Sequence, residues 1–180
     1  LYIAGGSYGG AFAGQAYYSS KAEGSAKISY CYVKDAVIGQ GGSLESAAGF
    51  IGATNDATVT FKDCYSHNLS LSNWDSKGKP GGFTGLAWGS GTLTFENCYT
   101  ADYFVVNSTV KKTEKKGAVI CTNVYTNTAR PEGCAVEGVT VLTTAQMKGN
   151  AAKTNFKGFD FDNDWSVTTD CYPELKKGAC

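Results

Sequence analysis

The chain has 180 residues, the size of a single domain, and its 16 basic and 16 acidic residues cancel at neutral pH. The basic residues form no stripe interleaved with aromatic residues, so we expect no nucleic-acid partner. No apolar run approaches the ~18 to 20 residues of a membrane span, which predicts no membrane insertion by this segment. Twenty-three glycines and 11 tyrosines favour an all-β chain with many tight turns.

A short phrase that ends in Cys-Tyr recurs along the chain. Its copies occupy residues 28–32, 61–65 and 95–99, and their cysteines are 64 − 31 = 33 and 98 − 64 = 34 positions apart. A degenerate fourth copy, residues 123–125, has Val124 where cysteine is expected. A period of this size predicts an array in which each unit stacks on the next.

A Gly-aromatic phrase precedes each Cys-Tyr phrase, at residues 9–12, 48–52 and 81–85, and residues 117–120 are its expected fourth copy. A turn and a strand-like run follow, most clearly at residues 57–61 and 91–95. In the first of these runs Val59 and Phe61 alternate with Thr58 and Thr60, the pattern of a half-buried strand. Apolar runs at 36–38, 69–71 and 103–106 come next, then loops at 39–46, 72–80 and 107–116. Each repeat is therefore expected to hold about three short strands.

The predicted fold is all-β, a parallel β-helix-like solenoid of about four coils, with a β-prism or sandwich as the alternative. Residues 1–126 would form the repeats and residues 127–180 a capping segment of the same domain. The segment from Thr143 to Gln146 has capping-box spacing, and Gly149 suits a helix terminus, which predicts a short helix over 144–148. Phe159, Phe161 and Trp165 are expected to be buried and to cover the open end of the last coil.

The cysteines of the repeat should stack in neighbouring coils. Stacked strands lie ~4.8 Å apart with nearly parallel Cβ vectors, which disfavours disulfides between Cys31, Cys64 and Cys98. They are predicted to be small buried thiols. The other cysteines leave two loop-closing pairs open, Cys121 with Cys134 and Cys171 with Cys180.

Through these repeated phrases, the chain resembles the GLUG-motif proteins of bacterial cell surfaces. Residues 81–85 (Gly-Gly-Phe-Thr-Gly) and 97–100 (Asn-Cys-Tyr-Thr) match the family phrase, as do 49–52 with 64–66. The first copy departs from it, with Tyr30 where asparagine is usual. The tail is similar to the closing segment of such proteins, through residues 142–148, 156–161, Trp165 and 172–175. The resemblance implies a secreted or surface-displayed bacterial protein, often an adhesin or a stalk region, and no catalytic residues.

Catalytic and metal chemistry find little support in the sequence. His67 is the one histidine, and no Gly-x-Ser-x-Gly elbow accompanies it, so we expect no catalytic residues and no enzyme. Asp160, Asp162 and Asp164 have the spacing that opens a calcium loop, but Trp165 stands where an EF-hand needs glycine. We therefore expect no metal and no cofactor.

Binding has a better basis, in aromatic residues at a shared offset from the glycine phrases. Tyr17 and Tyr18 follow Gly10 by seven and eight residues, and Trp88 follows Gly82 by six. If the repeats stack, these residues emerge from the same turn of successive coils, with Asn55 between them. Such aromatics can meet a sugar or a protein partner, or can fold onto their own coil. Trp74, in the 72–80 loop, is a further candidate.

The sequence therefore predicts a monomeric, non-enzymatic adhesion or binding module, extracellular or at the cell surface. Its partner would be a host or environmental glycan or protein. A structural stalk or accessory region of a larger secreted protein is the first alternative, and a carbohydrate-active enzyme is the second. Since the chain starts at Leu1 with no signal-like segment, we expect a mature domain or a fragment of a longer protein.

Overall fold

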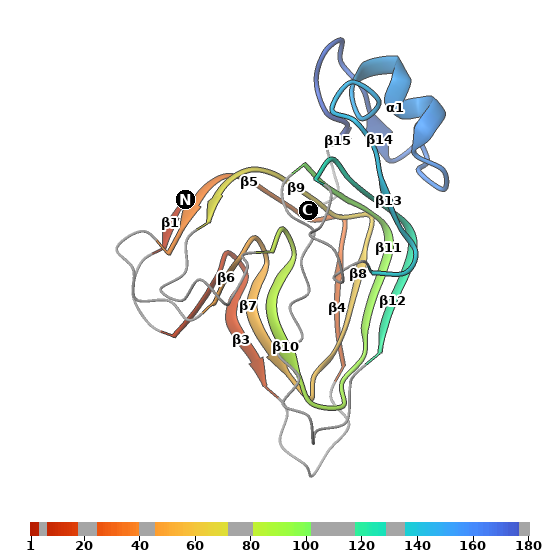
Figure 1. Cartoon of the computed structure of the whole chain (residues 1–180). Coiled ribbons are helices and arrows are strands. Elements are labelled where there is room, and N and C mark those ends of the chain that lie inside the picture. The colour runs from red at the N-terminus through yellow and green to blue at the C-terminus, as the bar shows by residue number, and fades with distance from the viewer. Residues whose placement is uncertain are drawn as a thin grey trace.

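A computed structural model of the chain describes residues 1–3, 7–17, 25–39, 46–71, 81–101, 118–128 and 136–176 (Figure 1). Strands predominate in these segments, and the helix that they contain is α1 (Gly149–Asn155). The predicted all-β class is therefore confirmed. The expected apolar run at 103–106 and most of the three expected loops lie outside the described residues.

The second copy of the repeat, residues 46–71, has four strands where the sequence predicted about three. They are β6 (Ser46–Ala48), β7 (Ile51–Asn55), β8 (Thr58–Lys62) and β9 (Tyr65–Leu71). The strand that the sequence missed is β6, whose Ser-Ala-Ala lacks the β-branched and aromatic residues that are typical of strands.

The other copies follow the same order. The first has β2 (Tyr8–Gly10), β3 (Ala13–Tyr17), β4 (Ser25–Ser29) and β5 (Tyr32–Ile38). The third has β10 (Thr84–Trp88) and β11 (Leu93–Thr100), and the fourth has β12 (Val119–Thr126). Ahead of them all, β1 (Tyr2–Ile3) pairs with β5.

Equivalent strands of successive copies pair in parallel and in register (Figure 1). One such line of paired residues runs from Ile28 through Phe61 and Phe95 to Cys121. Val124 pairs with Cys98, so valine takes the cysteine position of the fourth copy as predicted.

The fourth Gly-aromatic phrase was wrongly assigned. Val119 and Ile120 pair with Leu93 and Thr94, so they belong to a strand and not to the turn before it. The error arose because Gly117 precedes a run of apolar residues, as the glycines of the earlier phrases do.

The main core lies between the strands and consists of rows of like residues. Val59 and Phe61 are fully buried while Thr58 and Thr60 are only half-buried, which confirms the predicted alternation. The Phe61 ring stacks on that of Phe95, with centroids 5.1 Å apart. This separation is close to the ~4.8 Å between neighbouring strands, so the two rings fill the interior between the second and third copies.

Each copy bends sharply just before its Cys-Tyr pair, where the backbone adopts a left-handed conformation. The φ angles are +50° at Asp63, +50° at Asn97 and +54° at Asn123. The Asn97 amide donates to the Asp63 carboxylate at 3.2 Å, and the Asn123 amide donates to the Asn97 carbonyl oxygen at 3.0 Å. Burial raises the pKa of the Asp63 carboxyl, and the hydrogen bond from Asn97 opposes that shift.

The cysteine row follows directly and contains no disulfide. Cys64 and Cys98 are fully buried, and Cys31 is partly buried. The Cys98 thiol donates to the Glu96 carbonyl at 3.2 Å, within the same bend. The predicted ladder of unbridged thiols agrees with this arrangement. Cys134 and Cys180, the partners in the two pairings left open, lie outside the described residues.

After the fourth copy, β13 (Val139–Val141) continues the sheet alongside β12. The capping box then forms, since Gln146 N–H donates to the Thr143 hydroxyl and Thr143 N–H to the Gln146 side chain. It closes a turn over 144–147 and not the helix predicted there. The helix begins at Gly149, whose φ of +52° changes the direction of the chain. The Ala-Ala-Lys segment that follows consists of residues that favour a helix.

The C-terminal segment packs on the side of the repeats, and not over their open end as predicted. It covers the outward-facing tyrosines of three copies and adds α1 and the antiparallel pair β14 (Trp165–Ser166) and β15 (Glu174–Leu175) (Figure 1). We call this buried group the tyrosine cluster: Tyr65, Tyr99, Tyr125, Met147, Phe156, Phe159 and Trp165. Phe159 and Trp165 are buried as expected, whereas Phe161 is only partly buried. The C-terminal segment packs here because it buries tyrosine ring faces that would otherwise be exposed.

Candidate binding surface

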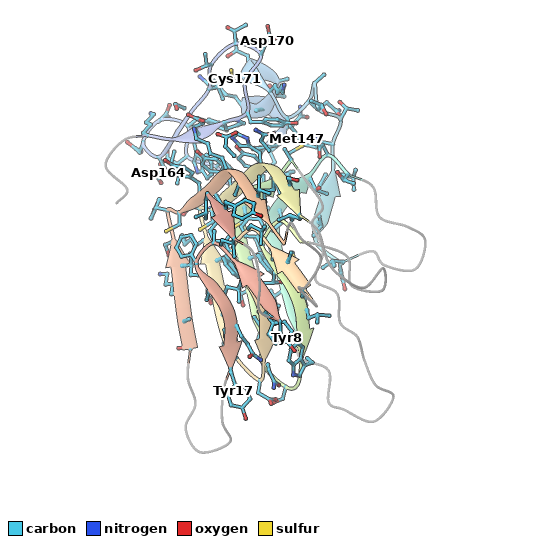
Figure 2. The ribbon with its side chains drawn as sticks, turned by 90° about the vertical axis from the view of Figure 1, so that its left-hand side faces the viewer. Tyr8, Tyr17, Met147, Asp164, Asp170 and Cys171 are labelled. Carbon is cyan, nitrogen blue, oxygen red and sulfur yellow. The ribbon has the colours of Figure 1, made fainter. Side chains whose placement is uncertain are left out.

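Three of the aromatic and amide residues singled out from the sequence lie side by side. In the sheet β3–β7–β10, Tyr17 pairs with Asn55, and Asn55 pairs with Trp88. Each is the last residue of its strand. Figure 2 shows Tyr17 at the end of the molecule opposite Met147 and Asp170 of the C-terminal segment. The structure therefore places these residues in one row across three copies.

β7 and β10 end at this row because their backbone turns left-handed immediately afterwards. The φ angle is +53° at Asp56 and +85° at Gly89. Ser90 donates to the Asp56 carboxylate twice, from its N–H at 2.7 Å and its hydroxyl at 3.0 Å. A side chain at position 89 would bring its Cβ to 2.3 Å from that carboxylate, so only glycine fits there. The carboxylate of Asp56, the acid nearest the row in sequence, is therefore hydrogen-bonded within the turn.

The row faces away from the main core. Ala16 and Ala87, one position earlier in their strands, pack against that core, whereas Tyr17, Asn55 and Trp88 are not part of it. Tyr17 is 63% exposed, and Asn55 and Trp88 are half-buried. Gln15, two residues before Tyr17 on the same strand, is also exposed. The outward face of this end of the sheet consequently carries rings and amides.

Tyr8 joins the row, although the sequence did not predict it there. Its ring lies 5.6 Å from that of Trp88, tilted by 53°. β2 belongs to a separate small sheet with β6, which lies against β7 and β10, because the Ser46 hydroxyl of β6 accepts a hydrogen bond from Leu86 N–H at 3.0 Å. A contact between layers from the first and third copies leaves no local signal in the sequence. We call Tyr17, Asn55 and Trp88, together with Tyr8, the aromatic row.

Two further candidates, Tyr18 and Trp74, lie outside the described residues. Of the five residues proposed from the sequence, the structure thus brings together Tyr17, Asn55 and Trp88.

The one histidine belongs to the contact between the repeats and the C-terminal segment. The His67 ring stacks on Tyr65 at 5.7 Å and on Tyr172 at 5.6 Å. Burial lowers the pKa of His67, and the positive charge of Lys34 lowers it further. Both effects favour a neutral ring that packs between two tyrosines.

The acids that suggested a calcium loop form a turn. The Asp160 carboxylate accepts hydrogen bonds from the N–H groups of Asp162 at 3.0 Å and Asn163 at 2.9 Å, and from the Asn163 amide at 2.8 Å. The hydrogen bonds from Asn163 lower the pKa of Asp160. No group of three potential metal ligands occurs in the part of the chain that the structure describes.

No family model, no curated protein and no solved structure matches this chain. Among the described segments, no helix is long and apolar enough to cross a membrane.

Proposed function

We propose that this chain is a non-enzymatic adhesion or binding module of a secreted or surface-anchored bacterial protein. It would act outside the cell as a monomer and bind a host or environmental glycan or protein through the aromatic row. The observation that supports this most is the register of Tyr17, Asn55 and Trp88 across three strands. Residues separated by 33 or more positions share one outward row only because the copies stack.

We further infer that the copies form a parallel β-helix-like solenoid of about four coils. The support is the pairing of equivalent strands, in parallel and in register, at the spacing of the sequence repeat. A sandwich would instead pair most neighbouring strands antiparallel. A solenoid aligns one position of every copy along its axis, which favours repeated, shallow binding surfaces over a single deep site.

The resemblance to the GLUG-motif proteins agrees with this proposal, since it implies surface display without catalytic residues. The aromatic row itself holds rings and amides, with no histidine, thiol or carboxylate to activate a nucleophile. Both considerations favour binding over the carbohydrate-active enzyme.

The stalk remains the competing proposal, and the contact between Tyr8 and Trp88 favours it. In that account Trp88 packs on its own molecule and binds nothing. The two proposals differ in the expected effect of truncating Trp88. A stalk loses stability alone, whereas a binding module loses affinity.

The test compares Trp88→Ala and Tyr17→Ala with the unmodified chain on host cells, a glycan array and a protein array. If each aromatic side chain contributes about 1.4 kcal/mol as an interface anchor, its substitution should weaken binding roughly tenfold. Tyr2→Ala is the matched control, because Tyr2 is 62% exposed and lies in β1, outside the aromatic row. Binding that survives both substitutions, with unchanged melting curves, would remove the aromatic row from the proposal.

A further inference from the structure

The aromatic row is small and linear. Neighbouring strands are ~4.8 Å apart, so three positions in register extend over roughly 10 Å. A stable protein–protein interface buries ~800 Å² on each partner, from about 20 to 30 residues. A row this short suits a few units of a linear polymer better than a folded protein.

The side chains combine flat apolar faces with neutral hydrogen-bonding groups. The rings of Tyr17 and Trp88 offer π faces that the C–H face of a sugar can cover. Asn55 lies between them in the row, and Gln15 is exposed beside Tyr17. An amide both donates and accepts hydrogen bonds, as each sugar hydroxyl does.

The row offers no charge to an ionic ligand. The strands β3, β7 and β10 contain no lysine, arginine or carboxylate. The adjacent Asp56 carboxylate is held by Ser90. Acidic sugars are commonly recognised by arginine or lysine, which this sheet does not supply.

One ring of the row is held in place before any ligand binds. Tyr8 lies against Trp88 with its ring tilted, so the indole is supported from within the molecule. A supported ring loses less conformational entropy on binding than a freely rotating one. The contact that favours a stalk is therefore also compatible with a prepared binding surface.

We propose that the ligand of the aromatic row is a neutral, linear polysaccharide, lying across the strands with its sugar rings on Trp88 and Tyr17. This inference rests on the proposed binding function and specifies its ligand class. Asn55 and Gln15 hydrogen-bond the sugar hydroxyls. Because no ion pair is formed, binding is insensitive to salt.

The experiment measures affinity for neutral polysaccharides (mixed-linkage β-glucan, mannan and xylan) and for acidic ones (polygalacturonate and alginate). The unmodified chain, Trp88→Ala and the control Tyr2→Ala are compared at about 0.05 and 0.5 M salt, conditions that change the screening length several-fold. At least one neutral polymer should bind equally well at both salt concentrations. Trp88→Ala should weaken that binding roughly tenfold, and Tyr2→Ala should leave it unchanged.

The contrary outcomes separate the two proposals. Binding that is restricted to the acidic polymers, falls with salt and still requires Trp88 would overturn the neutral ligand but keep the binding function. If Trp88 is needed to bind a protein on the array but is needed to bind no polysaccharide, the neutral ligand is also overturned and the binding function is kept. If no glycan or protein binding depends on Trp88 or Tyr17, both proposals fail.

Discussion

The rings of Phe61 and Phe95 lie parallel within 3°, with centroids 5.1 Å apart, although the two residues are 34 positions apart in sequence. Both are fully buried. Each ring packs against the ring of the neighbouring copy, so the core is continuous from one copy to the next. The stability of one copy therefore depends on its neighbours.

Truncation of this row should be severe. Phe61→Ala removes a buried ring from between two copies and should lower the free energy of unfolding by about 3 to 5 kcal/mol. Thr60→Ala is the control, because Thr60 is adjacent but faces outward. Urea unfolding of the two variants measures the difference. Equal, small effects would show that Phe61 does not lie in the interior.

The bend at Asn97 makes a different prediction, which compares two substitutions. Asn97→Ala loses the hydrogen bond to Asp63 and also places an alanine at a φ of +50°, where alanine costs ~1 to 2 kcal/mol. Asn97→Gly loses the hydrogen bond but tolerates the backbone. Alanine should consequently destabilise the protein more than glycine does. The reverse order in urea unfolding would contradict a left-handed bend.

The sequence predicted those features whose signals are local and periodic. The alternation around Val59 and Phe61 identified a strand, and the phrase around Val124 identified a degenerate copy, because both patterns repeat at the period of the fold. The sequence also predicted that Tyr17, Asn55 and Trp88 share one row, but the reference glycines Gly10, Gly49 and Gly82 were not equivalent positions. Gly10 pairs with Ala48, and Ala48 with Gly81, so each row residue follows its equivalent position by seven (17 − 10, 55 − 48 and 88 − 81).

Features that depend on contacts between distant segments were not predictable. The C-terminal segment was expected at the open end, but its Phe156 ring stacks on Tyr125 at 4.6 Å, on the side of the copies. The tyrosines have the same pattern whether water or a cap covers them. The capping box at Thr143 was correctly identified, but the helix predicted from it was misplaced. Gly149 was expected to end that helix, whereas the observed helix begins there.

The contact at His67 predicts that the protein loses stability in mild acid. Burial holds the pKa of folded His67 below its ordinary value, so the unfolded chain binds more protons. Stability is therefore complete above the unfolded pKa of about 6.5 and declines as the pH falls from there toward the folded pKa. Lys34 and Lys148 oppose the charged ring, while Glu174 and Asp35 favour it.

His67→Gln removes this titration and should flatten the dependence of Tm on pH between about 7 and 5. The measurement is thermal unfolding of both proteins across that range. Parallel pH profiles would show that His67 does not titrate differently in the folded state.

The cysteine row predicts graded reactivity. Burial raises the pKa of Cys98 well above its ordinary value, whereas Cys171 is exposed. Under native conditions a small alkylating reagent should modify Cys171 first, and Cys64 and Cys98 only after denaturant is added. Peptide mapping by mass spectrometry reads the result. A disulfide between any two of Cys31, Cys64 and Cys98 would contradict the stacked register.

The central claim, that the aromatic row binds the ligand, is tested most directly through the indole N–H signals of the three tryptophans. Two-dimensional ¹⁵N NMR during titration with an oligosaccharide of a bound neutral polymer resolves one signal for each. We expect the Trp88 signal to shift together with the Asn55 side-chain amide, while Trp165, fully buried in the tyrosine cluster, stays in place as the internal control. An unmoved Trp88 signal beside a shifted Trp74 signal would contradict the claim and move the site to the 72–80 segment.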